Sequence, residues 1–253
     1  MSSKLVITLA TLGLLAAVAL FVVSATLDSA VKQAVNRLAP SITGTTVTLD
    51  DVSLSPLSGS GTLSGLFIGN PAGWSGDKLA YLGRIHVDVA PTSLLGDTIV
   101  IHDIVIEQPE FVYETRLVTS NIKQLLQQIE DNTGGGSSKV APAAGEPPGE
   151  PKKLAVQRFI LRDAKVTVGV GPAAVTVPMP DLELNDLGTP ENGLTSSQLA
   201  FAVSREVLND IITAVTTGVA NGTINLNKAS DGVKKVGNTL RGLLGGAQDP
   251  DGD

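Results

Sequence analysis

The stretch VTLDDVSL, residues 47–54, decides the fold of this chain, because its spacing of apolar residues returns further along the sequence. The full copies are IVIHDIVI, residues 99–106, and LAVQRFIL, residues 154–161. Each copy holds two alternating apolar pairs with one extra residue between them. Alternation places one apolar face on a β-strand, and the extra residue either forms a bulge or exchanges the buried face.

Shorter segments extend this pattern into a sheet. Partial copies occur at residues 63–68 and 182–187, an alternating strand occurs at residues 85–89, and residues 166–177 form a hairpin around Gly171-Pro172. The sequence therefore predicts an α+β fold with a mainly antiparallel sheet. We expect this sheet to be curved, or to form a groove, with one apolar face, one polar face and short helices beside it.

Helical spacing of apolar residues predicts the remaining elements. Residues 121–129 form a short helix, and Thr195 with Gln198 forms a capping box that begins a longer helix reaching about Val219. Apolar and basic residues over 233–244 predict a weaker helix, because its glycines lower the helix propensity. The two later helices are amphipathic and form the C-terminal part of the predicted fold.

The N-terminal segment predicts a transmembrane helix. Residues 5–23 carry no charge, and at about 1.5 Å per residue they would span roughly 28 Å, close to the thickness of a bilayer core. A cleaved signal peptide is the alternative, since Val23-Ser24-Ala25 resembles a cleavage site, but the apolar run exceeds the usual length of such a signal. Beyond it, residues 27–38 predict an amphipathic stalk that ends at Pro40 and packs on the body. The residues that represent the anchor are Leu5, Leu14, Leu20, Phe21 and Val23.

The composition and the motifs exclude several classes of function. The net charge of −7 argues against nucleic acid as a partner, and the absence of cysteine excludes disulfides, thiolate metal sites and a cysteine nucleophile. His86 and His102 are the only histidines, and no third ligand lies at metal-binding spacing, so we predict neither a metal nor a cofactor. No serine-hydrolase or phosphate-loop motif occurs, and we predict no catalytic residues and no enzyme.

A shift in composition divides the predicted chain. The segment TGGGSSKVAPAAGEPPGEPK is rich in glycine, proline and serine, and it either separates two domains or loops between strands of one sheet. The predicted units are a membrane anchor and stalk helix (1–40), a first β domain (41–132), a flexible linker (133–152), a second β region with a helix (153–220), and a weak amphipathic helix with a disordered tail (221–253).

Residues 1–130 carry a resemblance to a known family. The motifs, in order, are Gly65-Leu66-x-Ile68-Gly69-Asn70-Pro71, Ser93-Leu94-Leu95, Gln108-Pro109-Glu110 and SNIKQLLQQI from Ser120. With the N-terminal anchor, they resemble the AsmA-like family of bacterial envelope proteins. The resemblance implies a single-pass protein of the inner membrane with its body in the periplasm. It also implies a β-groove, phospholipid as a partner, a part in lipid transport or outer-membrane biogenesis, and other envelope proteins as further partners.

The apolar face of the sheet is the candidate functional surface. It either forms an open groove that acyl chains complete, or a closed core under the helix that begins at Thr195. The first case predicts a lipid-binding protein or an accessory of phospholipid transport. The second predicts a non-catalytic structural or protein-interaction module of the envelope. The predicted groove residues are Leu49, Leu66, Ile68, Ile85, Val87, Val89, Ile99 and Ile101.

Overall fold

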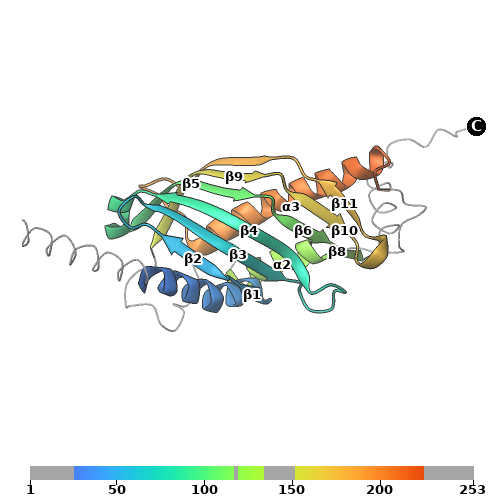
Figure 1. The fold of residues 1–253 in the computed structure, drawn as a ribbon, viewed down its shortest axis with the longest axis horizontal. Helices are drawn as coiled ribbons and strands as arrows, with labels where there is room; N and C mark the ends of the chain where they lie inside the picture. The colour runs from blue at the N-terminus through green and yellow to red at the C-terminus, as the bar shows by residue number, and fades with distance from the viewer. Residues whose placement is uncertain (1–25, 117–118, 134–151, 225–253) are drawn as a thin grey trace, which may run out of the picture.

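The computed structural model describes residues 26–116, 119–133 and 152–224 as a large sheet with helices against one face (Figure 1). The strands are β1 (Val47–Thr48), β2 (Asp51–Leu54), β3 (Ser60–Gly69), β4 (Lys78–Val89), β5 (Thr98–Glu107), β6 (Glu110–Tyr113), β7 (Thr115–Arg116), β8 (Thr119–Ser120), β9 (Lys153–Arg162), β10 (Lys165–Val168), β11 (Val175–Pro178) and β12 (Leu182–Leu187). The helical elements are a helix over residues 26–43, η1 (Pro91–Leu95), α2 (Asn121–Thr133), η2 (Gly171–Ala173) and α3 (Ser196–Ala220). The α+β class is therefore as the sequence predicts.

Ten of the strands belong to one sheet. Most of them lie end to end in pairs, so that each pair forms one longer strand with an interruption in the middle. β4 pairs with β3 on one side, while its other side pairs with β5 along its C-terminal part and with β6 along its N-terminal part. In the same way β9 and β10 lie beside β5 and β6, and β12 and β11 lie beside β9 and β10. The strands before and after residues 134–151 thus share one sheet.

The interruptions lie at one level and divide the sheet into two halves. Gly65, Gln108 and Asp163 have φ angles of 67°, 51° and 52° at this level. The Gln108 amide donates across it to the Arg162 carbonyl at 2.9 Å. We call β2, β5, β9 and β12 with the adjoining parts of β3 and β4 the η1 half, and β1, β6, β10 and β11 with the rest of β3 and β4 the β6 half.

The repeated sequence pattern produces a bulge that keeps the apolar residues on one face. Asp88 pairs with Asp103, whereas Val89 pairs with Ile101, so His102 is the extra residue of β5. His102 is exposed, while Ile101 is buried. The bulge therefore points both apolar pairs inward, and the buried face is not exchanged.

The pairing of the sheet is mixed rather than antiparallel throughout. β5 runs parallel to β9, and β6 runs parallel to β10, while the other strand pairs of the described sheet are antiparallel. Parallel neighbours need a long crossover connection, and the chain between β6 and β9, which contains α2, provides it.

Apolar side chains form continuous rows across the inner face. One row in the η1 half joins, pair by pair, Val52, Leu63, Ile85, Ile106, Leu161 and Leu182. A row in the β6 half joins Val47, Ile68, Ala80, Phe111, Val166 and Val177. Residues of α2 and α3 form a single hydrophobic core with these rows, apart from Val47 and Val52 at the edge.

The helix of residues 26–43 satisfies the free edge of the sheet. Asp28, Lys32 and Asn36 recur at four-residue intervals, which places them on one side of the helix. The Asn36 amide bonds both main-chain groups of Leu49, with 2.6 Å from the Leu49 nitrogen to Asn36 Oδ1 and 3.3 Å from Asn36 Nδ2 to the Leu49 carbonyl. Asp28 accepts a bond of 2.7 Å from the Leu54 amide, and Lys32 donates to the Asp50 carbonyl. Side chains thus replace the neighbour strand that an edge lacks.

The helix ends differ in part from the predicted ones. The helix of residues 26–43 continues past Pro40 and ends before Gly44, whose φ of 67° suits a helix C-terminus. α2 extends to Thr133, beyond the predicted end at residue 129. The capping box that begins α3 is confirmed: Thr195 and Gln198 exchange side-chain to main-chain bonds of 2.9 and 3.2 Å.

Several predictions fall on residues outside the described part of the chain. They are the anchor helix over 5–23, nearly all of the linker and the weak helix over 233–244. Within the described ranges, no helix combines the length and the apolar character needed to cross a membrane.

The edge interaction predicts a selective loss of stability in Asn36→Ala. This substitution leaves the buried Leu49 without partners for its main-chain amide and carbonyl, which should lower the free energy of unfolding by about 1–3 kcal/mol. Denaturant unfolding measures the change. Gln33→Ala, an exposed position on the same helix, is the control and should change stability by less than about 0.5 kcal/mol. Equal effects of the two substitutions would contradict this role of Asn36.

Candidate functional site

The inner face of the sheet is covered unevenly. In the β6 half, Ala80, Val166 and Val168 are 0% exposed and Val177 is 2% exposed. In the η1 half, many aliphatic residues are only partly buried although they pack against the same core. These residues are Leu63, Val87, Val89, Ile99, Ile104, Leu154, Leu184 and Leu187. The sheet therefore has a closed half and an incompletely covered half.

Helix α3 shows the same gradient along its length. It begins in the η1 half, where Leu194 pairs with Leu154, and it runs along the inner face to the β6 half, where Gly218 adjoins Val177 (Figure 1). Its C-terminal part contains the fully buried Ile211 and Val215. In its N-terminal part, none of the described side chains before Leu208 is fully buried, and the apolar ones are Leu199, Phe201, Val203 and Val207.

The sheet and the helix are thus both incompletely buried at the same end. Aliphatic groups there meet fewer protein neighbours than in the β6 half, and each group loses part of its dispersion and burial energy. An apolar guest that lies between the η1 half and the start of α3 would complete the burial. We call this region the apolar surface. It consists of Leu63, Val87, Val89, Ile99, Ile104, Leu154, Leu184 and Leu187 of the sheet and Leu199, Phe201, Val203 and Val207 of α3.

The predicted groove residues divide between the two environments. Leu49, Ile85 and Ile101 are only 2–8% exposed. Ile85 and Ile101 belong to the hydrophobic core, and Leu49 is buried at the sheet edge beside Asn36. Leu66 and Ile68 are partly buried but lie in the β6 half. Val87, Val89 and Ile99 belong to the apolar surface. Sequence reasoning did not include the β9, β12 and α3 members of this surface. The repeat copies at 154–161 and 182–187 were the signal that identifies the strand members.

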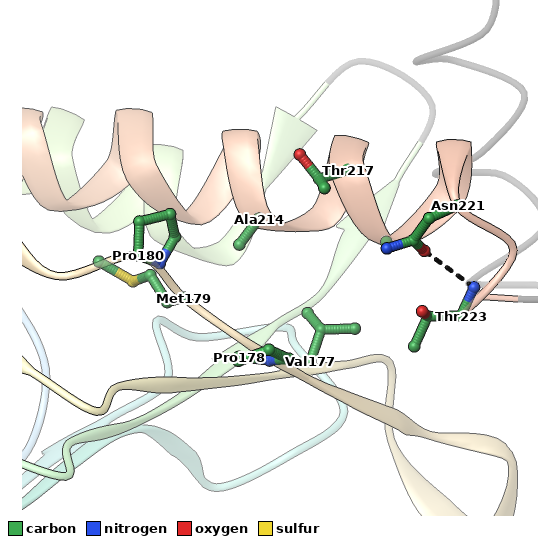
Figure 2. Close-up of a pocket in the computed structure, with 9 residues that line it drawn as sticks. Val177, Pro178, Met179, Pro180, Ala214, Thr217, Asn221 and Thr223 are labelled. Carbon is green, nitrogen blue, oxygen red and sulfur yellow. Dashed lines mark hydrogen bonds between the residues drawn. The ribbon is translucent and has the colours of Figure 1, made fainter.

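A shallow pocket of about 350 Å³ lies at the opposite end of α3 (Figure 2). Its walls come from the end of β11 with the residues that follow it, and from the last turns of α3. The lining residues are Val177, Pro178, Met179, Pro180, Ala214, Thr217, Gly218, Asn221 and Thr223. The only hydrogen bond drawn within it runs from the Thr223 amide to Asn221 Oδ1, at 3.0 Å. No titratable side chain lines the pocket, so it offers no group for acid–base chemistry.

The outer face of the sheet is polar and charged. Lys78 donates to Glu110 at 2.8 Å and lowers the pKa of this carboxyl group, and Asp103 accepts from Arg158 at 2.5 Å and raises the pKa of the guanidinium. A shallow depression of about 500 Å³ lies between β3, β4 and β5 on this face. Its lining residues are Thr62, Ser64, Arg84, His86, Val105 and Glu107.

The two histidines lie on this outer face without a shared ligand set. His86 lines the depression, whereas the Nδ1 atom of His102 lies 3.0 Å from Gln157 Oε1. Among the described residues, no group of three or more histidine, aspartate or glutamate side chains could hold a metal ion. Burial raises the pKa of the Tyr113 phenol in the core, and burial with the nearby Glu206 raises the pKa of Asp210 on α3.

A buried polar cluster fixes the loop between β3 and β4 at the β6 end. Glu114 is 7% exposed, and its carboxylate accepts bonds from Asn70 and from the main-chain amides of Ser75 and Gly76 at 2.8–3.1 Å. Asn121, which is fully buried, donates to Asn70 and to the Val112 carbonyl. Every polar atom of this carboxylate has a structural partner, so the cluster holds the loop in place and presents no free reactive group.

The chain matches no protein-family model, and no curated protein matches it. What the apolar surface can bind therefore follows from its own geometry and chemistry.

Overpacking substitutions should distinguish the two halves of the sheet in solution. Val166→Phe adds volume where the side chain is 0% exposed, and it should lower the free energy of unfolding by about 1–3 kcal/mol. Val87→Phe adds the same volume at the apolar surface and should change stability by less than about 0.5 kcal/mol. Chemical denaturation of both variants measures the difference. A cost for Val87→Phe as large as that for Val166→Phe would show that the η1 half is closed.

Proposed function

We propose that this chain is a membrane-anchored, non-catalytic protein of the bacterial envelope that binds lipid acyl chains on its apolar surface. The observation that carries the proposal is the gradient of burial, which is shared by the inner face of the sheet and by α3. Leucine, isoleucine and valine are among the residues most often buried in folded proteins. Here most of the partly buried aliphatic residues of the sheet lie in the η1 half, whereas Ala80, Val166 and Val168 in the β6 half are 0% exposed.

The chemistry of the apolar surface favours a lipid chain over other small molecules. Its sheet members are all leucine, isoleucine and valine, which give non-directional contacts and no polar group to orient a ligand. Such a surface accepts a flexible hydrocarbon chain and does not discriminate between headgroups. Phospholipid is therefore the proposed ligand class.

The sequence supports the proposed location. Residues 5–23 have the length and the apolar character of a membrane anchor, and the motifs of residues 1–130 resemble AsmA-like proteins. We propose on this basis that the body lies in the periplasm beside the inner membrane and assists phospholipid transport or outer-membrane biogenesis, together with other envelope proteins.

A closed structural or protein-interaction module is the second candidate. The burial of Ile85 and Ile101 favours it, because these predicted groove residues belong to one hydrophobic core with residues of α2 and α3. It differs from the first proposal in one measurable property, which is access of lipid to the apolar surface.

Photo-crosslinking tests the proposed function. Full-length protein in liposomes that contain a phospholipid with a diazirine near the end of its acyl chain should give crosslinked peptides from β5, β9 and the N-terminal part of α3. A filled variant, Val87→Phe with Ile104→Phe, should lose most of these crosslinks, whereas Val105→Phe on the outer face should retain them. Mass spectrometry of the peptides identifies the sites. Crosslinks that spare β5, β9 and α3 would reject lipid binding and favour the closed module.

A further inference from the structure

Three exposed leucines lie at the η1 end of the molecule. Leu57 is 74% exposed, Leu94 is 38% exposed and Leu95 is 94% exposed. Leu57 lies in the turn between β2 and β3, and the other two end η1. No other large apolar residue of the described chain is as exposed as Leu57 and Leu95. Exposed apolar residues that gather in one patch mark an interaction surface. We call these three residues the leucine tip.

The two segments that carry the leucine tip are neighbours. The Val89 amide, which precedes η1, donates to the Gly59 carbonyl at 2.9 Å, and a Cβ at Gly59 would come within 3.1 Å of Pro91. The turn of Leu57 and the start of η1 are therefore packed against each other. Their leucines extend from one end of the sheet.

Both segments hold a fixed conformation. The Gly59 amide closes the turn by donating to the Ser55 carbonyl at 2.9 Å. In η1, the hydroxyl of Ser93 donates to the Ala90 carbonyl at 2.7 Å and accepts from the Val100 amide at 2.9 Å. Lys152 also donates to the Leu94 carbonyl at 2.5 Å. The leucines are thus held outward by a bonded main chain, which lowers the entropic cost of inserting them into an apolar medium.

The described chain begins at this same end. Asp28 accepts a bond from the Leu54 amide, directly before the turn of Leu57. Figure 1 shows the first described turn of the helix of residues 26–43 and η1 at one end of the sheet. The uncharged run of residues 5–23 precedes this helix by two residues in sequence. The point where the chain enters the fold from that run is therefore close to the leucine tip.

We propose that the leucine tip inserts into the surface of a lipid bilayer, as a second membrane contact besides residues 5–23. The occupant is a bilayer because residues 5–23 are uncharged, are numerous enough to span one as a helix, and precede the fold at the end where the leucines lie. The contact is apolar in nature, since the chain carries a net charge of −7 and gains no general attraction to anionic lipid. It does not require a lipid inside the body and so goes beyond the proposed function.

A single fluorescent label measures this contact in the full-length chain. The protein has no cysteine, so Thr92→Cys, an exposed position in η1, accepts one environment-sensitive fluorophore. Ala72→Cys, an exposed position in the loop at the β6 end, is the matched control. In phosphatidylcholine liposomes with a brominated lipid, the label at position 92 should be quenched and the label at position 72 should not.

The leucines themselves are tested by Leu57→Ser, Leu94→Ser and Leu95→Ser in the Thr92→Cys protein. Quenching should fall to the level of the Ala72→Cys control, while thermal unfolding stays unchanged because the replaced side chains are exposed. Quenching that persists in this variant would overturn the proposal, since the anchor alone would then place residue 92 near lipid. Absence of quenching in the parent protein would overturn it as well.

Two more measurements separate apolar insertion from a charge contact and from self-association. Raising the salt concentration should leave quenching intact, because salt screens charge interactions and not apolar insertion; a loss would assign the contact to charge and overturn the proposal. Crosslinking between residues 92 of two copies, without quenching, would assign the leucine tip to a second copy of the chain and overturn it too. The loss of acyl-chain crosslinks in the Val87→Phe, Ile104→Phe variant tests the proposed function separately, so either proposal can fail alone.

Discussion

A ten-stranded sheet with one aliphatic face must bury that face against helices, because the free energy of leaving it in water grows with the exposed apolar area. Two helices, α2 and α3, contribute buried residues to this core. α2 begins beside β6, where Asn121 donates to the Val112 carbonyl, and it packs against α3. In the η1 half, Ile106 and Leu161 are buried, whereas Val87 and Ile99 stay partly exposed. The N-terminal part of α3 begins in this half. The proposed lipid site follows from this unequal cover.

The interruption level explains how one sheet contains two such different halves. β5 and β6, β9 and β10, and β12 and β11 are interrupted at the same level, whereas β3 and β4 run through it and join the two halves. At this level the chain leaves little room for a side chain: a Cβ at Gly65 would lie 2.2 Å from the carboxylate of Asp50. The break is thus built from small or left-handed residues, and the hydrogen bonds between neighbouring breaks keep the sheet continuous.

Local patterns in the sequence predict most of the helices and strands, but they do not predict which distant strands pair or which residues the helices cover. The spacing around His102 predicts either a bulge or an exchanged face, and the register of Val89 with Ile101 decides for the bulge. The capping box at Thr195 predicts the start of α3 because all its contacts lie within four residues. The parallel pairing of β5 with β9 depends on residues far apart in the chain, and alternation alone cannot give it. For the same reason Ile85 and Val87 look equivalent in the sequence, although the structure buries one and leaves the other partly exposed.

The contact between the helix of residues 26–43 and the sheet edge depends on the amino acids of the helix more than on those of the strands. Asp28, Lys32 and Asn36 contribute particular side chains, whereas the strand side contributes only its main chain. Every amino acid except proline carries the same main-chain groups. Substitutions along the edge strands can therefore accumulate without loosening this contact, provided the inward residues stay apolar. Three positions on successive turns of the helix of residues 26–43 therefore bond this helix to the sheet edge, while the side chains of the edge strands are free to diverge.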